Sequence, residues 1–331
     1  MAPAEAAIIL GGRGSWRQYP AYAGQAAARV RGDSRYVLVS QNKTPIAAAN
    51  LRIRRLPLIP MASALISHGP VLVRSPDQWE SDLRFTLAAL ASELSARERM
   101  EIRIDPDPLW NIAGLDFERF ALELGLSRSG DQYQTFLLDL HHSPDKLKKA
   151  MDPKWRSDLK KGMLQGLTIT RSTESEDFAR FQTLFDDLST TKGFEVTQGP
   201  SFFASVANQA VDGERIVLHS ISRDGELLSG HIGAFSGSTA TYLLGATSAR
   251  GRDLRASYVA QWAVIEFARS LGMRWYDLGG ADEAANPEVF RFKKRMGGAF
   301  VKSAPAFMIR PSGVSGALLA LARKAYSARG R

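Results

Sequence analysis

The stretch from Arg215 to Ser248, RIVLHSISRDGELLSGHIGAFSGSTATYLLGATS, carries the pattern that decides the fold. Its apolar segments are separated by the pairs Asp224-Gly225 and Ser236-Gly237, and such residues form tight turns between antiparallel strands. The pattern therefore predicts a meander of three strands.

Helices are expected on both sides of this meander. Two precede it, over residues 177–189 and 202–211, and a long one follows over residues 256–271. The long helix is expected to end at Gly272, because a residue without a β-carbon suits a left-handed cap. Two more strands are expected near the end of the chain, over residues 274–280 and 299–309.

The first half of the chain repeats this order of elements without repeating its residues. A long amphipathic helix is predicted over residues 78–97, where leucines recur on one stripe. A shorter helix is predicted over residues 117–124. Extended segments are predicted over residues 36–41, 45–53, 64–73, 100–105 and 134–140. The fold class is therefore mixed α/β, with two tandem domains of the same plan and a cleft between or beside them.

The boundary between the domains is expected where turn residues and charge interrupt the apolar pattern, in HHSPDKLKKAMDPKWRSDLKKG (residues 141–162). The predicted domains are residues 1–145 and 146–310. The segment 311–331 is expected to pack back on the first domain as a basic amphipathic helix. Contact of this helix with the inner face of a membrane is the alternative.

Composition excludes several classes of protein. The 331 residues include 43 Lys and Arg against 34 Asp and Glu, a formal charge of +9 that favours anionic partners. Cysteine is absent, which excludes thiolate catalysis and disulfides. The five histidines show no metal-binding spacing, so we expect no metal. No GxGxxG, Walker or GxSxG motif is present, so dinucleotide oxidoreductases, P-loop NTPases and serine hydrolases are excluded.

The ends and the apolar stretches of the chain predict a cytoplasmic protein. The short apolar run near the N-terminus lacks a basic segment before it, unlike a signal peptide. No apolar stretch approaches the roughly 20 residues that a membrane-spanning helix needs. The sequence gives no indication of the oligomeric state.

The segment RFKKRMGGAF, residues 291–300, concentrates four cations ahead of two glycines. Taken by itself, it is typical of a solvated basic turn. An alternative is a site for negative charge, in which the paired glycines let the backbone approach a substrate. Asp277 precedes another glycine pair at the predicted end of a strand, where it is either a turn former or a general base that orients an acceptor amine.

Four stretches in the second half of the chain resemble the FemABX family of peptidyltransferases, which have a GNAT-like acyltransferase fold. They are LDLHHSPDKLKKAMDPKWRSDLKKGMLQGLTI, LFDDLSTTKGFEV, YLLGATSARGRDLRASYVAQWAVIEFARSLGMRWYDLGGA and FRFKKRMGG. In the first half, ISHGPVLV is similar to a Gly-Pro strand of that family. The paired-helix arm that some members carry has no counterpart here.

The resemblance implies two tandem GNAT-like domains and a reaction. An amino acid would move from aminoacyl-tRNA to an amine of a peptidoglycan precursor, with no cofactor beyond the donor substrate. By position, Phe292 and Lys293 match a functional pair of the family. Lys293 would face a groove and stabilise negative charge on the ester under attack, and the Phe292 carbonyl would hold the acceptor ammonium.

The resemblance also implies substrate contacts. Arg156 matches a recurring arginine, and Lys192 lies where relatives present a basic residue to the acceptor. Tyr242 and Thr247 lie on the strand that borders the family's substrate cleft. Arg156, Lys192 and Tyr242 each have an ordinary structural explanation as well. We expect the neighbouring cations Lys294 and Arg295 to assist phosphate binding.

Two other functions remain open from the sequence. An acyl-CoA N-acyltransferase holds pyrophosphate on backbone N–H groups of a glycine-rich turn, and the corresponding segment SARGRDLRAS (residues 248–257) has the single glycine Gly251. Its arginines would meet phosphate by side chain instead. A noncatalytic RNA-binding module is the second alternative, although surface aromatics do not alternate with the cations.

Overall fold

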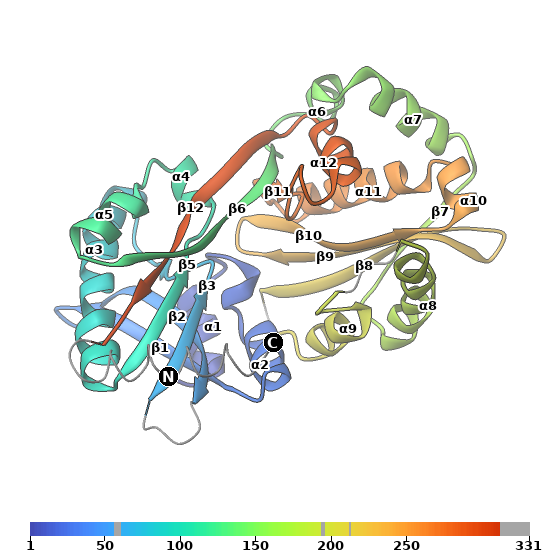
Figure 1. The fold of residues 1–331 in the computed structure, drawn as a ribbon. Coiled ribbons are helices and arrows are strands. Elements are labelled where there is room, and N and C mark those ends of the chain that lie inside the picture. The colour runs from blue at the N-terminus through green and yellow to red at the C-terminus, as the bar shows by residue number, and fades with distance from the viewer. Residues whose placement is uncertain (56–60, 193–195, 212, 312–331) are drawn as a thin grey trace. The chain divides into compact units, whose positions relative to one another are not determined.

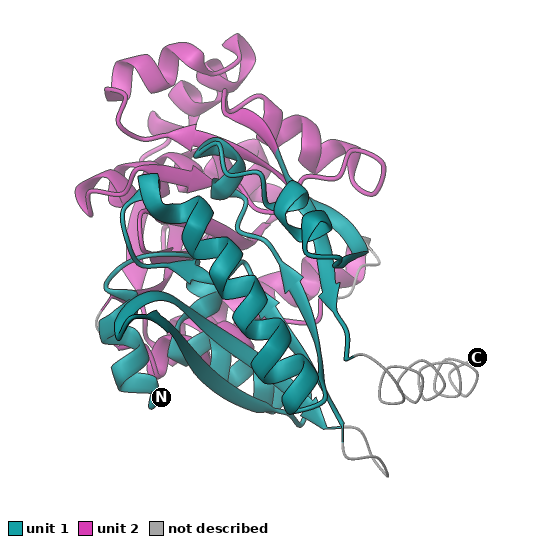
Figure 2. Ribbon diagram, turned by 90° about the vertical axis from the view of Figure 1, so that its left-hand side faces the viewer, with its two compact units in different colours: residues 1–133, 302–331 teal, residues 134–301 magenta. Residues whose placement is uncertain are grey.

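The computed structural model describes residues 1–55, 61–192, 196–211 and 213–311, without the side chain of Lys192. These residues form two compact units (Figure 2): residues 1–133 with 302–311, and residues 134–301. The predicted helix at the C-terminus lies outside the described residues. The division differs from the predicted boundaries because strand β6 (Ser127–Asp139) contributes to both units, as does β12 (Ala299–Ile309). The end of β12 pairs with β5 (Met100–Asp105), so residues 302–310 belong to the first unit.

The first unit is built on a sheet in the strand order β1-β2-β3-β5-β12. Neighbouring strands are antiparallel except β3 and β5, and β4 pairs with β2. The remaining strands are β1 (Asp33–Gln41), β2 (Thr44–Arg55), β3 (Ala62–Ser67) and β4 (Val71–Leu72). The helices are α1 (Pro3–Leu10), α2 (Pro20–Arg29), α3 (Trp79–Ala89), α4 (Leu109–Ile112) and α5 (Phe117–Glu123), with short 3-10 turns at Trp16–Gln18 and Pro76–Gln78.

The long helix predicted over residues 78–97 changes its winding midway. It is α-helical in α3 and continues as a π-helix over Leu90–Arg97. The leucines of the predicted stripe are nevertheless all buried, and they join the core of the first unit. The spacing of the apolar residues predicted the buried face correctly. It did not predict the π-helical turns.

The second unit is built on a sheet in the strand order β6-β11-β10-β9-β8-β7. Its remaining strands are β7 (Thr168–Ser172), β8 (Glu214–Arg223), β9 (Glu226–Ser236), β10 (Thr239–Thr247) and β11 (Trp275–Asp277). The helices are α6 (Pro144–Ala150), α7 (Pro153–Met163), α8 (Ser175–Lys192), α9 (Pro200–Asn208), α10 (Ala249–Asp253), α11 (Ala256–Ser270) and α12 (Pro287–Lys294). The predicted meander is confirmed as β8, β9 and β10, which pair antiparallel.

Helices cover both faces of the second sheet (Figure 1). Helix α11 packs on β8, β9 and β10 with α7 beside it, while α8 and α9 pack against the opposite face. Strands β10 and β11 pair in parallel from Thr239 to Thr241, and β10 then continues to Thr247 paired with β9 on its other side. The sheet therefore opens beyond this short pairing.

The charged segment 141–162, which we placed at the domain boundary, folds into helices of the second unit. Ser143 caps α6 and Asp152 caps α7, and each cap is followed by proline at the first helical position. Leu147 and Trp155 are buried in the core of this unit.

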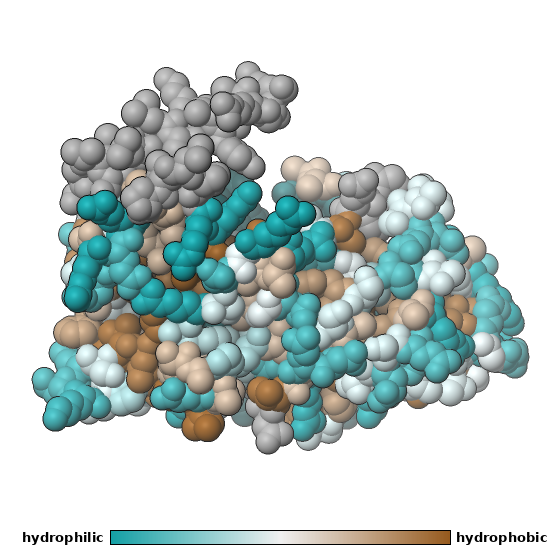
Figure 3. Space-filling model, turned by 90° about the horizontal axis from the view of Figure 1, so that it is seen from below, coloured by the Kyte–Doolittle hydropathy of each residue, from teal (hydrophilic) through white to brown (hydrophobic). Residues whose placement is uncertain are grey.

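Hydrophilic residues predominate on the face shown in Figure 3, where apolar residues appear as small, separate patches. Among the described residues, none of the helices combines the length and the apolar character needed to cross a membrane.

Candidate active site

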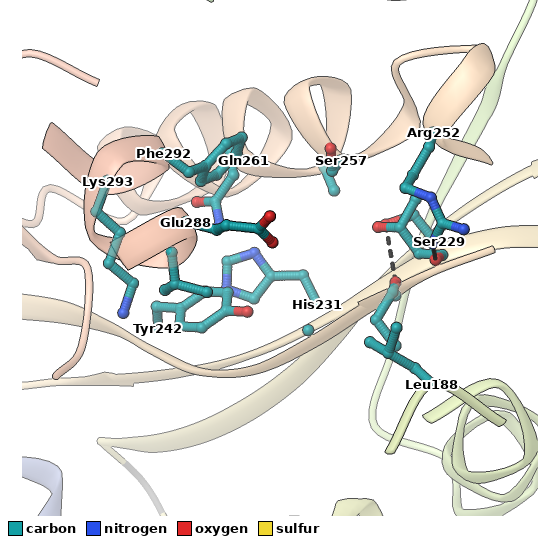
Figure 4. Close-up of a pocket in the computed structure, with 16 residues that line it drawn as sticks. Leu188, Ser229, His231, Tyr242, Arg252, Ser257, Gln261, Glu288, Phe292 and Lys293 are labelled. Carbon is teal, nitrogen blue, oxygen red and sulfur yellow. Dashed lines mark hydrogen bonds between the residues drawn. The ribbon is translucent and has the colours of Figure 1, made fainter. Parts of the chain in front are cut away.

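A cavity of about 280 Å³ lies in the second unit, where the sheet opens beside β10 (Figure 4). Strands β9 and β10 and helices α8, α10, α11 and α12 each contribute to its wall. The polar and aromatic side chains in the wall are Ser229, His231, Tyr242, Thr247, Arg252, Ser257, Gln261, Glu288, Phe292 and Lys293. Four sequence-predicted residues are therefore brought together here: Tyr242, Thr247, Phe292 and Lys293.

Lys293 is a buried cation in this wall. Helix α12 begins at Pro287 after an Asn286 cap, which places Lys293 on its inward face with 7% of the residue exposed. The ammonium Nζ donates to the Gly280 carbonyl at 2.7 Å and lies 5.1 Å from the centre of the Tyr242 ring. Burial lowers the pKa of Lys293 to about 8, and nearby Asp277 opposes this shift. The side chain is thus a hydrogen-bond donor whose charge is weakly solvated.

The loop that receives Lys293 is held by Asp277. This carboxylate accepts from the Gly279 N–H at 2.8 Å and from the Thr135 hydroxyl. Asp277 is buried and does not line the cavity. Its contacts are those of a turn former, so we leave the general-base assignment of Asp277 out of the proposal below.

Phe292 forms an aromatic wall with residues of two other helices. Its ring centre lies 5.4 Å from that of Tyr258 and 6.0 Å from that of Trp155. At the end of α12 the Met296 N–H donates to the Lys293 carbonyl at 3.0 Å. In a regular α-helix the Met296 N–H would donate to the Phe292 carbonyl instead. The tighter turn therefore leaves the Phe292 carbonyl without this bond.

Tyr242 and Thr247 lie in the cavity wall on β10. Burial raises the pKa of Tyr242 to about 12, so its hydroxyl stays protonated at neutral pH. A β-carbon on Gly245 would come within 2.4 Å of that hydroxyl, which explains the glycine between them. The Thr247 hydroxyl lies 2.8 Å from that of Ser229.

The other predicted contacts lie elsewhere or are not described. Arg156 is half-buried and donates to the carbonyls of Lys149, at 3.0 Å, and Met151, at 2.5 Å, at the end of α6. Lys294 and Arg295 are exposed on the outer side of the α12 terminus and do not line the cavity. Lys192 ends α8, and its side chain is outside the described structure.

The glycine pair 297–298 serves packing and does not line the cavity. Gly297 has a φ of +83°, and a β-carbon there would lie 2.4 Å from the Ala150 carbonyl oxygen. A β-carbon on Gly298 would lie 2.8 Å from the Leu138 side chain. The pair therefore allows the chain to pass closely between α6 and β6.

The segment that corresponds to a pyrophosphate turn is closed by its own hydrogen bonds. Gly251 N–H donates to the Ser248 hydroxyl, and Arg252 N–H donates to the Ser248 carbonyl, both at 3.0 Å. Leu254 N–H donates to the Arg250 carbonyl, also at 3.0 Å. These N–H groups are engaged within the α10 turn, which is unlike the open cradle that holds pyrophosphate.

Sequence reasoning missed a polar network at the base of the cavity. Tyr276 donates its hydroxyl hydrogen to Gln261 Oε1 at 2.6 Å, and His231 Nε2 lies 3.4 Å from the same hydroxyl oxygen. His231 is 2% exposed, and burial lowers its pKa well below the usual value, so the imidazole is neutral. The alternation of SGHIG in β9 predicts one buried face but gives no reason to single out its histidine.

The fold and the cavity define a class of protein, the GNAT-like acyltransferases. A family model described as an acetyltransferase (GNAT) domain matches residues 153–294, which include α7 through α12 and every residue of the cavity wall. The chain is an enzyme of the acyltransferase class.

More specific relatives are known by sequence and by structure. Lipid II:glycine glycyltransferase of Staphylococcus saprophyticus is 22% identical, with 77% of each chain covered. The protein of the same name from Staphylococcus aureus is 22% identical over 80% of each chain. A solved structure of FemX aligns over 97% of this chain and 98% of its own, with a TM-score of 0.81 and 20% identity. These relatives confirm the resemblance to the FemABX family.

Proposed function

We propose that the chain transfers an amino acid from aminoacyl-tRNA to an amine of a peptidoglycan precursor. One observation carries the proposal: the ammonium group of Lys293 is buried in the wall of the cavity. A cation held out of water costs stability, and functional sites are where such groups concentrate. The names of the staphylococcal relatives support a lipid-linked peptidoglycan precursor as the acceptor class.

The chemistry of the proposed transfer needs few catalytic groups. A neutral acceptor amine attacks the ester carbonyl, a C–N bond forms, and the bond from the carbonyl carbon to the ribose oxygen breaks. The proton that the amine loses ends on the departing ribose oxygen. Because negative charge collects on the carbonyl oxygen during attack, a fixed donor beside it lowers the barrier, and losing such a donor typically costs about 10²- to 10³-fold in rate.

Lys293 is the residue we assign to this role. Among the described residues its Nζ has one hydrogen-bond acceptor, the Gly280 carbonyl, and an ammonium group has three hydrogens to donate. Phe292 would hold the acceptor amine through its carbonyl, as the tightened turn at the end of α12 favours.

The closed α10 turn favours tRNA over CoA as the carrier. An acyl-CoA enzyme would present backbone N–H groups of this turn to pyrophosphate, and three of these groups are already donated within the turn. Arg252 lines the cavity; its Nη1 donates to the Thr247 carbonyl at 3.0 Å, and the other N–H groups of the guanidinium could meet a phosphate, which a tRNA terminus also carries.

A transfer assay with two donors tests the proposal. The purified protein is incubated with tRNA carrying a radiolabelled amino acid, or with labelled acetyl-CoA, and with lipid II or its soluble nucleotide-linked precursor. We expect label on the precursor from charged tRNA only, abolished by ribonuclease. Transfer from acetyl-CoA alone would identify an N-acyltransferase, and RNA binding without transfer from either donor would identify a binding module.

A further inference from the structure

His231 provides an unused acceptor in the wall of the cavity. The single hydroxyl hydrogen of Tyr276 goes to Gln261 Oε1, so the 3.4 Å contact between Tyr276 and His231 requires the imidazole to donate from Nε2. A neutral imidazole that carries its proton on Nε2 has a lone pair on Nδ1. That Nδ1 atom is buried and, within the described structure, has no hydrogen-bond partner.

The position of this acceptor relates it to Lys293. Both side chains line the same cavity, and the His231 ring centre lies 4.6 Å from that of Tyr242, over which the Lys293 ammonium is placed. Figure 4 shows the His231 ring between Tyr242 and the carboxylate of Glu288. Glu288 is the one carboxylate among the residues that line the cavity. The donor Nζ and the acceptor Nδ1 thus belong to two side chains that line one cavity.

An aminoacyl group matches this pair of atoms. Its carbonyl oxygen needs a donor, and its amino group, one carbon away, supplies hydrogens that a plain acyl group lacks. The α-amino group has a pKa of about 7.7–8.0, and both of its protonation states donate hydrogen bonds. Leaving a buried acceptor without a partner is unfavourable, so a site of this kind discriminates against a ligand that cannot donate to it.

We propose that His231 Nδ1 accepts a hydrogen bond from the α-amino group of the donor substrate, so that the cavity selects aminoacyl over unsubstituted acyl groups. This inference rests on the proposed function and adds a specificity-determining residue to it. It also restricts the orientation of the donor, because contacts at the carbonyl oxygen and at the amino group fix the direction of the aminoacyl group in the cavity.

Binding of stable donor analogues tests the inference without requiring turnover. The ligands are 3′-alanylamido-3′-deoxyadenosine and its propionyl counterpart, which differ only in the amino group. Calorimetry with the wild-type protein is expected to show the alanyl ligand binding about 10- to 100-fold more tightly. In His231→Phe the two ligands are expected to bind with similar affinity, while binding of the propionyl ligand is retained.

A neighbouring histidine supplies the matched control. His219 pairs with His231 across β8 and β9 and is fully buried, yet it does not line the cavity. His219→Phe should therefore keep the full preference for the alanyl ligand. His231→Gln, which retains an acceptor, is expected to keep part of it. Thermal melts verify that each variant is folded.

Two results would overturn the inference: equal binding of the two ligands by the wild type, or an unchanged preference in His231→Phe. A second ligand pair, alaninamide and propionamide, separates this outcome from failure of the proposed function. If neither nucleoside binds but alaninamide is preferred in a His231-dependent way, the amine site stands and the tRNA donor is wrong. If no ligand with an amine is preferred in either pair, the role of His231 is wrong.

Discussion

At the scale of the residue, Lys293 shows a conflict between stability and function. The folded protein holds this side chain away from water, which lowers its pKa from 10.5 to about 8. The unfolded chain binds more protons than the folded one between these values, so the free energy of unfolding rises with pH across this window. Below pH 8 the full cost of the buried charge is present.

Lys293→Met is therefore expected to stabilise the protein. At pH 7 the variant avoids the burial of a charge, and we expect its free energy of unfolding to exceed that of the wild type by the order of 1–3 kcal/mol. The difference should shrink as the pH rises from 8 to 10.5, because the folded wild type loses this proton before the unfolded chain does. Urea unfolding at several pH values measures this, and a variant less stable than the wild type at pH 7 would show that the ammonium is well compensated.

Single functional residues could be predicted from the sequence only where a family motif marks them. Lys293 and Phe292 were identified through the resemblance, since the residues alone favour a solvated basic turn. His231 was missed because its role depends on which ring nitrogen carries the proton. That assignment follows from the hydrogen bonds of Tyr276 with Gln261 and His231, which the sequence does not show. Arg156 matches a recurring arginine of the family but closes the end of α6 with two hydrogen bonds.

At the scale of the element, the loop from Asp277 to Gly280 sets the position of the Lys293 ammonium. Gly279 has a φ of +72°, and a β-carbon there would lie 2.7 Å from the Tyr242 carbonyl oxygen. Gly280 supplies the acceptor for Nζ, and a β-carbon on it would meet nothing within 4 Å. A side chain is therefore unfavourable at Gly279, whereas Gly280 has room for one.

Gly279→Ala is expected to destabilise the protein by about 1–3 kcal/mol, because alanine disfavours a left-handed backbone and the new methyl group would displace β10. We also expect a lower transfer rate, since the loop that receives Lys293 would shift. Gly280→Ala is the control and should change neither property appreciably. Equal effects of the two substitutions, by thermal unfolding and transfer rate, would contradict this account of the loop.

Elements were predictable where apolar spacing and turn residues agreed. The meander β8-β9-β10 and helix α11 lie where expected, ending at the Asp-Gly and Ser-Gly turns and near Gly272. Helices α6 and α7 were overlooked because their exposed faces are rich in lysine, although the Ser-Pro and Asp-Pro pairs mark both of their starts. Strand β12 crosses from one unit to the other, which local patterns do not reveal.

At the scale of the whole molecule, the excess of positive charge favours an anionic macromolecule as a partner. Part of this charge lies on α7, where Lys154, Lys160 and Lys161 are exposed. This helix belongs to the unit that contains the cavity. We expect its lysines to contribute to the binding of charged tRNA.

Changing these three lysines to glutamine is expected to weaken tRNA binding and its dependence on salt. Each lost phosphate contact removes about 0.7 to 0.9 from the slope of log K against log salt, so the slope should decrease by roughly 2. The control removes three exposed cations from the first unit, Arg13, Arg29 and Arg54, and should leave the slope unchanged. A lysine variant whose slope equals that of the wild type would exclude α7 from the binding surface.

The overall organisation was predicted well because the two halves of the chain share an order of helices and strands, although they do not share residues. Two α/β units of similar plan were expected and the fold class is confirmed, while the unit boundaries differ because the chain returns to the first unit through β12. Charge and composition favour an anionic partner, which stays a prediction. The location of the cavity could not be predicted from the sequence. It depends on where β10 and β11 stop pairing, and these strands are distant in the chain.

The most direct test of the central claim is the single-turnover rate of transfer from charged tRNA by Lys293→Met at saturating donor. If the ammonium stabilises charge on the ester under attack, the rate should fall about 10²- to 10³-fold. Donor affinity and folding should be preserved. A folded variant that binds donor and transfers at the wild-type rate would contradict the account.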